Sequence, residues 1–213
     1  ALQLPTDASM NPNLRIALTG MILLAIALGI GRFLLTPLLP VMQADAGLSL
    51  VGGGWLASVN NLGYLAGALL CIVVALPQRQ ALRWGLLAIA LSTAGMGLMH
   101  GMVSWLAWRL LAGVAAAVLV VHGIAWSMRR LHASGHPLLE ALVFTGPGVG
   151  IVVSGVAVAG LQPLGVSSAA SWIGFGLVGA LVAAWVWRTL ERSPTAATAH
   201  ANAATMARPT GPA

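Results

Sequence analysis

The chain has 213 residues, of which 59% are hydrophobic and only 7% are charged, whereas a soluble domain carries roughly 25% charged residues. This composition excludes an ordinary soluble protein. The net charge is +6, and all 10 basic residues are arginines. They stand singly or in pairs between apolar runs, which indicates control of membrane topology and not a surface for nucleic acid. We therefore expect no nucleic-acid partner.

The apolar runs predict an all-α membrane protein with six transmembrane helices, since each span needs about 20 apolar residues. We expect a polar N-terminus over 1–13, a six-helix bundle over 14–190 and a disordered Ala/Thr/Pro tail over 191–213. The first span is predicted to stop at Pro40 and the second at Pro77. The predicted spans are about 14–39, 51–76, 84–103, 105–128, 137–161 and 169–187.

Arginines predict the orientation of these spans. The loops on one side contain Arg15, Arg79, Arg83, Arg129, Arg130, Arg188 and Arg192, and those on the other side contain none. Because positive loops stay inside, both termini are expected in the cytoplasm, with the bilayer of a bacterial inner membrane as the main partner. The tryptophans agree, since each lies near a predicted span end.

Glycine and proline positions predict how the helices pack. Pairs spaced by four residues, Gly63/Gly67, Gly97/Gly101 and Gly146/Gly150, allow helix backbones to approach closely. Pro37 and Pro147 lie inside predicted spans, where a missing backbone N–H favours a kink.

Polar residues inside the spans are the candidate binding residues. Arg32 and Arg109 would lie in the outer half of the membrane, where a charge is costly and usually faces a cavity or a partner. Snorkelling to the interface is the alternative for both. For the asparagines of the second span, the alternative is hydrogen bonding between helices. The candidate substrate-binding residues are Arg32, Arg109, Asn60, Asn61, Tyr64 and Thr36.

The charge around these arginines favours an anionic solute. Asp45 is expected in an outer loop and Glu140 at the inner end of the fifth span, so neither carboxylate accompanies Arg32 or Arg109. Guanidinium groups bind carboxylates and similar anions bidentately. The pattern therefore favours a carboxylate or another anion at mid-membrane.

Enzyme and metal signatures are lacking in the sequence. His132 and His136 have the spacing of some metal ligands, but we expect no Cys or acid beside them and no metal. No catalytic constellation is visible. We expect neither an enzyme nor a cofactor.

Two helices carry a resemblance to a known family. The segment Gly29-Ile-Gly-Arg-Phe-Leu-Leu-Thr-Pro-Leu-Leu-Pro40 and the segment Trp55-Leu-Ala-Ser-Val-Asn-Asn-Leu-Gly-Tyr-Leu-Ala-Gly67 resemble the N-terminal half of a major facilitator superfamily transporter of the YbfB/YjiJ-type branch. The resemblance covers residues 14 to 190 and implies two inverted three-helix repeats, with the first and fourth spans lining a cavity.

Further motifs refine the resemblance. Arg109 with Gly113 and Ala117 is similar to the superfamily's R-x-x-x-G-x-x-x-A pattern, whose arginine is linked in the family to proton coupling. The segment Gly146-Pro147-Gly-Val-Gly150 is similar to part of the antiporter G-P-x-x-G motif, which supports antiport. With the kink expected at Pro37, the candidate gating or kink residues are Pro37, Gly146, Pro147 and Gly150. The loop from Pro77 to Arg83 departs from the family's charged signature.

The predicted function is transmembrane transport of a small organic solute, with an anion favoured and proton coupling left open. One alternative is an exporter of drugs or metabolites. The other is a half that transports nothing by itself and associates with another membrane subunit. The superfamily normally uses two six-helix bundles, so a second half or a homo-oligomer is an expected partner.

Overall fold

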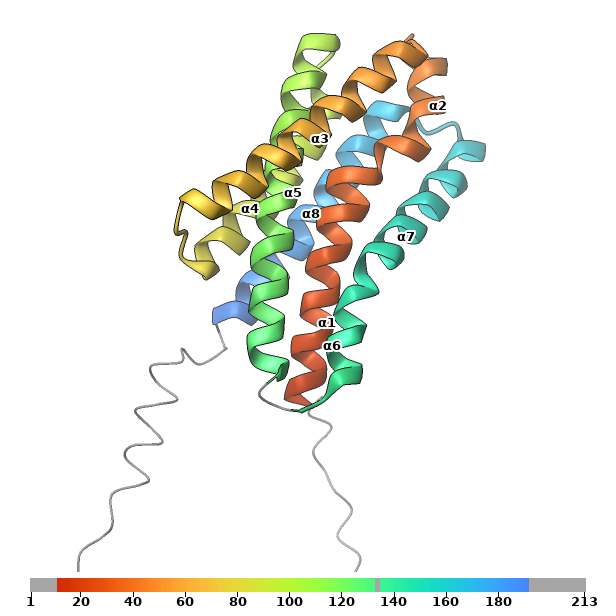
Figure 1. Ribbon diagram of the computed structural model, residues 1–213. Coiled ribbons are helices and arrows are strands. Elements are labelled where there is room, and N and C mark those ends of the chain that lie inside the picture. The colour runs from red at the N-terminus through yellow and green to blue at the C-terminus, as the bar shows by residue number, and fades with distance from the viewer. Residues whose placement is uncertain (1–10, 133–134, 192–213) are drawn as a thin grey trace, which may run out of the picture.

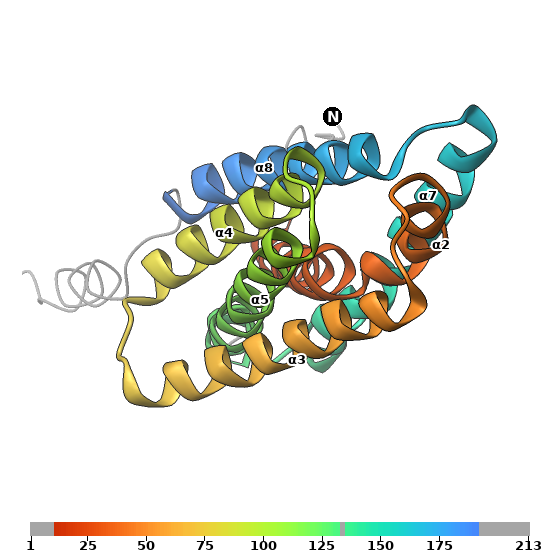
Figure 2. The same cartoon turned by 90° about the horizontal axis from the view of Figure 1, so that it is seen from above.

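The computed structural model describes residues 11–132 and 135–191. In this part of the chain, six helical segments are long and apolar enough to span a membrane. Figures 1 and 2 show how the helices are arranged, seen from two directions. Most of the predicted N-terminus and tail, and Arg192 with them, lie outside the described residues.

The first span is one long helical segment in three parts. It begins with α1 (Pro12–Leu24), widens into the π-helical η1 (Ala25–Phe33) and continues as α2 (Leu35–Asp45). Our prediction of an end at Pro40 was wrong. Pro40 lies within α2 and is exposed, and the N–H that it lacks would have bonded a carbonyl on the same exposed side. The helix ends at Asp45, and Gly47, with a φ of 65°, turns the chain.

The next three spans follow with short turns. Helix α3 (Leu50–Val73) starts where the Ser49 hydroxyl accepts the Gly52 N–H at 3.0 Å. Helix α4 (Gln78–Leu98) begins six residues earlier than predicted. Its first turns contain Arg79 and Arg83, and the Arg83 guanidinium lies 4.8 Å from the Trp187 ring. Helix α5 (Met102–Leu131) is likewise longer than predicted.

The fifth span is interrupted and the sixth is continuous. Helix α6 (Pro137–Phe144) is followed by Thr145, which interrupts the helix, and α7 (Gly146–Leu161) resumes with Pro147 in its first turn. A short 3₁₀ turn, η3 (Gln162–Leu164), leads to α8 (Ser168–Glu191). The start of α1 and the end of α8 lie at the same end of the bundle (Figure 1).

The helices pair in a way that agrees with two three-helix repeats. Helix α3 packs along α5, which joins the second and fourth spans, and α7 packs along η1, which joins the fifth and first. Exchanging the first three spans with the last three converts one pairing into the other. Helices α4 and α8, in the third and sixth spans, pack against each other and complete the pattern.

Glycines allow the closest of these pairings. A methyl group at Gly63 would overlap the Leu110 carbonyl oxygen of α5, and one at Gly150 would overlap the Ala25 carbonyl oxygen. Gly97 meets the backbone of α8. Gly101 differs from our expectation. It lies in the α4–α5 turn with a φ of 98°, and a Cβ at this position would meet no atom within 4 Å. Two of the three glycine pairs thus serve helix packing.

We expect Gly63→Ala to lower the thermal stability of the protein, because the added methyl group must push α3 away from the α5 backbone. Overpacking of this kind costs about 1–3 kcal/mol. The matched control is Gly54→Ala in the same helix, where a Cβ meets nothing within 4 Å. Thermal unfolding in detergent, followed by size-exclusion chromatography, measures both variants. Equal melting temperatures would contradict the tight α3–α5 contact.

Candidate functional site

The structure divides the candidate binding residues into two groups. Arg32 and Tyr64 are half-buried, and Thr36 and Asn61 are exposed. We refer to the surface that these four residues form as the open side of the bundle. Arg109 and Asn60 are buried, with exposures of 2% and 1%. The two groups meet at the backbone of η1.

Arg32 is held by three side chains on the open side. Its Nη2 donates to Asn61 Oδ1 at 3.1 Å. Its Cζ lies 4.6 Å from the centre of the Tyr64 ring and 5.5 Å from that of Phe33. Such cation–π contacts hold the flat guanidinium in place. Asn61 accepts from one of the five N–H groups of this guanidinium.

Phe33 was not among the residues that sequence reasoning selected. Its ring is 37% exposed and lies beside the Arg32 guanidinium. The aromatic residue next to a membrane arginine is a signal that could have found it, because arginine often stacks on aromatic faces.

Arg109 is buried between helices and does not line the open side. Its Nη2 donates to the Arg32 carbonyl at 2.7 Å, and its Nη1 lies 3.4 Å from the Gly31 carbonyl. The snorkelling alternative does not describe this geometry, since the guanidinium points to the backbone of the first span. Its Nε is buried and forms no hydrogen bond within the described part of the chain.

The Arg109 contact lies where the first span changes its helical pattern. Arg32 is near the end of the π-helical η1, and α2 begins at Leu35. Pro37, in the first turn of α2, contributes no N–H to the backbone bonds of this junction. In the membrane interior an unsatisfied carbonyl is costly. Arg109 donates to the Arg32 carbonyl from a different helix.

Asn60 completes this contact from the second span. Its Nδ2 donates to the Arg109 carbonyl at 2.9 Å and lies 3.4 Å from the Gly31 carbonyl. The alternative that we kept for this residue, hydrogen bonding between helices, is therefore the geometry that the structure shows. Asn60 and Arg109 together connect η1, α3 and α5.

Carboxylates are engaged elsewhere. Asp45 Oδ1 and Oδ2 accept hydrogen bonds from the Ser168 hydroxyl and amide at 2.8 and 2.6 Å. Glu140 Oε1 lies 3.4 Å from His132 Nδ1. Our expectation that no acid lies beside His132 was therefore wrong, because the turn before α6 brings Glu140 back to it. In the described part of the chain, no three His, Cys, Asp or Glu residues gather as metal ligands do.

The predicted gating residues lie where the first and fifth spans touch. Gly146 packs on the Met21 backbone and Gly150 on that of Ala25. Pro147 follows directly after the interruption at Thr145. Pro37 is in the first turn of α2, just beyond the π-helical segment. These residues flank the segment that carries Arg32.

Comparison with known proteins identifies the family. A family model described as "Uncharacterised MFS-type transporter YbfB" matches residues 24–212. The chain belongs to this family of the major facilitator superfamily. The resemblance seen in the first two spans is thereby confirmed, and the chain is a multi-pass membrane protein of a transporter family.

Curated relatives agree with the family. The chain is 26% identical over 164 residues to the uncharacterized MFS-type transporter YceJ of Bacillus subtilis, covering 76% of this chain and 37% of the relative. It is 33% identical over 106 residues to the uncharacterized MFS-type transporter YcaD of Escherichia coli, covering 49% of this chain and 27% of the relative. The matches thus span about a third of each relative's length. No solved structure matches.

We expect Arg109→Leu to destabilise the bundle, because the Arg32 carbonyl loses its donor inside the membrane. A buried acceptor left unsatisfied costs about 1–3 kcal/mol. Arg109→Lys, which keeps one charged donor, is expected to lie between Arg109→Leu and wild type. Thermal unfolding in detergent is the measurement.

Arg32→Gln is the matched control, since the Arg32 side chain is on the open side and only its carbonyl bonds Arg109. We expect a melting temperature close to that of wild type. If Arg109→Leu is as stable as Arg32→Gln, the carbonyl contact does not hold the spans together.

Proposed function

We propose that the protein takes part in moving a small organic anion across the membrane and that Arg32 binds the anionic group. The observation that carries this proposal is the state of the Arg32 side chain. It is half-buried in a membrane-spanning segment, and it contacts an amide oxygen and two aromatic rings. A guanidinium has five N–H donors, so most remain for a carboxylate.

The surroundings of Arg32 support a solute with an apolar body. Phe33 and Tyr64 present aromatic rings beside the guanidinium, and the exposed Thr36 lies one helical turn further along. A carboxylate on a small apolar body would pair with Arg32 and rest against these rings. Asn61 and Thr36 would orient it by hydrogen bonds.

Arg109 and Asn60 have a different part in this proposal. Arg109 donates to the Arg32 carbonyl. Asn60 donates to the Arg109 carbonyl and lies within hydrogen-bond distance of the Gly31 carbonyl. They would fix the backbone from which the Arg32 side chain projects, so they are positioning residues. The Gly146–Gly150 segment would serve as the hinge at which the fifth span moves against the first.

A second six-helix bundle would complete the cavity, because the matched relatives are about three times as long as the matched region and alternating access rocks one bundle against another. A second copy of this chain is the alternative source of that bundle. We infer that the arginine-rich loops lie on the cytoplasmic side of a bacterial inner membrane, as the positive-inside rule indicates.

The test is uptake of small carboxylates and of their neutral amides, such as benzoate and benzamide, into proteoliposomes that contain the protein. We expect carboxylates to be taken up in preference to amides. Arg32→Gln should reduce carboxylate uptake at least tenfold, and Arg32→Lys should reduce it less, since an ammonium keeps the charge but not the bidentate geometry.

Arg188→Gln is the control for loss of an arginine as such, because Arg188 is exposed near the end of α8. Its uptake should equal that of wild type. Uptake restricted to cations or neutral solutes would refute the anion assignment, and normal carboxylate uptake by Arg32→Gln would remove Arg32 from the site.

A further inference from the structure

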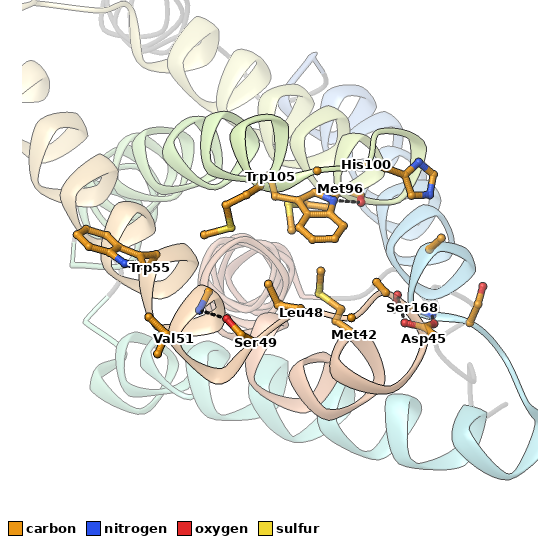
Figure 3. A pocket seen from close by; sticks show the side chains of 17 residues that line it. Met42, Asp45, Leu48, Ser49, Val51, Trp55, Met96, His100, Trp105 and Ser168 are labelled. Atoms are coloured by element: carbon orange, nitrogen blue, oxygen red, sulfur yellow. Dashed lines mark hydrogen bonds between the residues drawn. The ribbon is translucent and has the colours of Figure 1, made fainter.

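A cavity of about 740 Å³ lies at the end of the bundle opposite the arginine-rich loops. It is bordered by the α2–α3 turn, the α4–α5 turn and the start of α8 (Figure 3). It shares no residue with the Arg32 cluster. Trp55, on its border, precedes Asn61 by six residues, or about 9 Å along α3 at 1.5 Å per residue. The cavity is therefore a separate site.

Thioethers and indoles form much of the cavity wall. Met42, Met96 and Met102 contribute flexible apolar side chains, and Trp55 and Trp105 contribute aromatic surface. Pockets of roughly 300–1,000 Å³ with a mainly apolar lining and a few polar groups are typical of small-molecule sites. Methionine adapts to irregular ligands. The size and lining suit an organic molecule of moderate size.

The wall is partly fixed and partly free. Trp105 is 7% exposed, and its Nε1 donates to the Met96 and Met99 carbonyls at 3.1 and 2.9 Å. Met42 is buried as well. By contrast, Trp55 is 60% exposed and lies at the border of the cavity. A rigid floor with one exposed indole can receive a ligand without unfolding a helix.

The charged and aromatic groups at the cavity indicate the charge of the ligand that it would bind. Among the described residues that line it, Asp45 alone carries a formal charge when His100 is neutral. Each Asp45 carboxylate oxygen accepts one hydrogen bond from Ser168 and has a further lone pair. The exposed indole face of Trp55 also attracts cations. An anion would meet a carboxylate here, whereas a cation meets two favourable groups.

We propose that this cavity binds an apolar organic cation, with its apolar body against the methionines and Trp105 and its charge near Asp45 and the Trp55 ring. Such a ligand differs in charge from the anion assigned to Arg32 and does not depend on that assignment. It would contact three connections at this end of the bundle and would restrain them relative to one another.

Binding of tetraphenylphosphonium to the purified protein in lipid nanodiscs tests this proposal. Tetraphenylborate, which has the same shape and the opposite charge, is the matched probe, and empty nanodiscs correct for partition into lipid. We expect saturable binding of the cation only. Asp45→Asn should raise the dissociation constant at least tenfold, because asparagine can still accept the Ser168 amide but carries no charge.

Trp55→Leu is the second variant, since Trp55 is exposed and its loss leaves the core intact; a several-fold weaker affinity is expected. Arg32→Gln should bind the cation as wild type does. Equal binding of both probes, or unchanged affinity in both Asp45→Asn and Trp55→Leu, would overturn the proposal. Loss of binding in Arg32→Gln would place the cation at the other site and would overturn it too.

Discussion

The bond from Arg109 to the carbonyl of Arg32 is the contact on which the centre of this bundle depends. Arg32 lies where the π-helical η1 gives way to α2, close to Pro37, which has no N–H, and hydrocarbon offers no water to the carbonyls of such a junction. Arg109 donates to that carbonyl from the fourth span, and Asn60 ties the second span to the same point. A local irregularity in one helix thus fixes the relative positions of three.

The same contact separates the two arginines by task. The Arg109 guanidinium donates to backbone carbonyls, whereas the Arg32 guanidinium is held at the open side by Asn61 and Tyr64. Close packing of Gly146 on Met21 and of Gly150 on Ala25 supports this arrangement, because backbones that touch leave little room for the first span to shift. The structural role of one arginine therefore prepares the binding role proposed for the other.

The length of the apolar runs predicted the six spans. Polar residues inside those spans led to Arg32, Asn61 and Tyr64 as one candidate group, and the structure brings these three together. Arg109 could not be placed in the same way. Whether a membrane arginine faces a cavity or a backbone depends on the local shape of the neighbouring helix, and residue type does not reveal the π-helical turns of η1. The continuation of α2 through Pro40 was missed for a similar reason, since the cost of a proline depends on where the lost bond points. The cavity near Asp45 was not predicted because it forms from three connections that are distant in the sequence.

Arg32 contacts its neighbours through two chemically independent groups. Its side chain contacts Asn61, and its peptide carbonyl accepts from Arg109. Every amino acid at position 32 would present the same carbonyl to Arg109. The side chain at this position can therefore change over evolution without removing the bond that holds the helices. If Arg32 binds the solute as proposed, the solute that is recognised can change while the helix packing persists, so substrate range and folding would be under separate selection at a single residue.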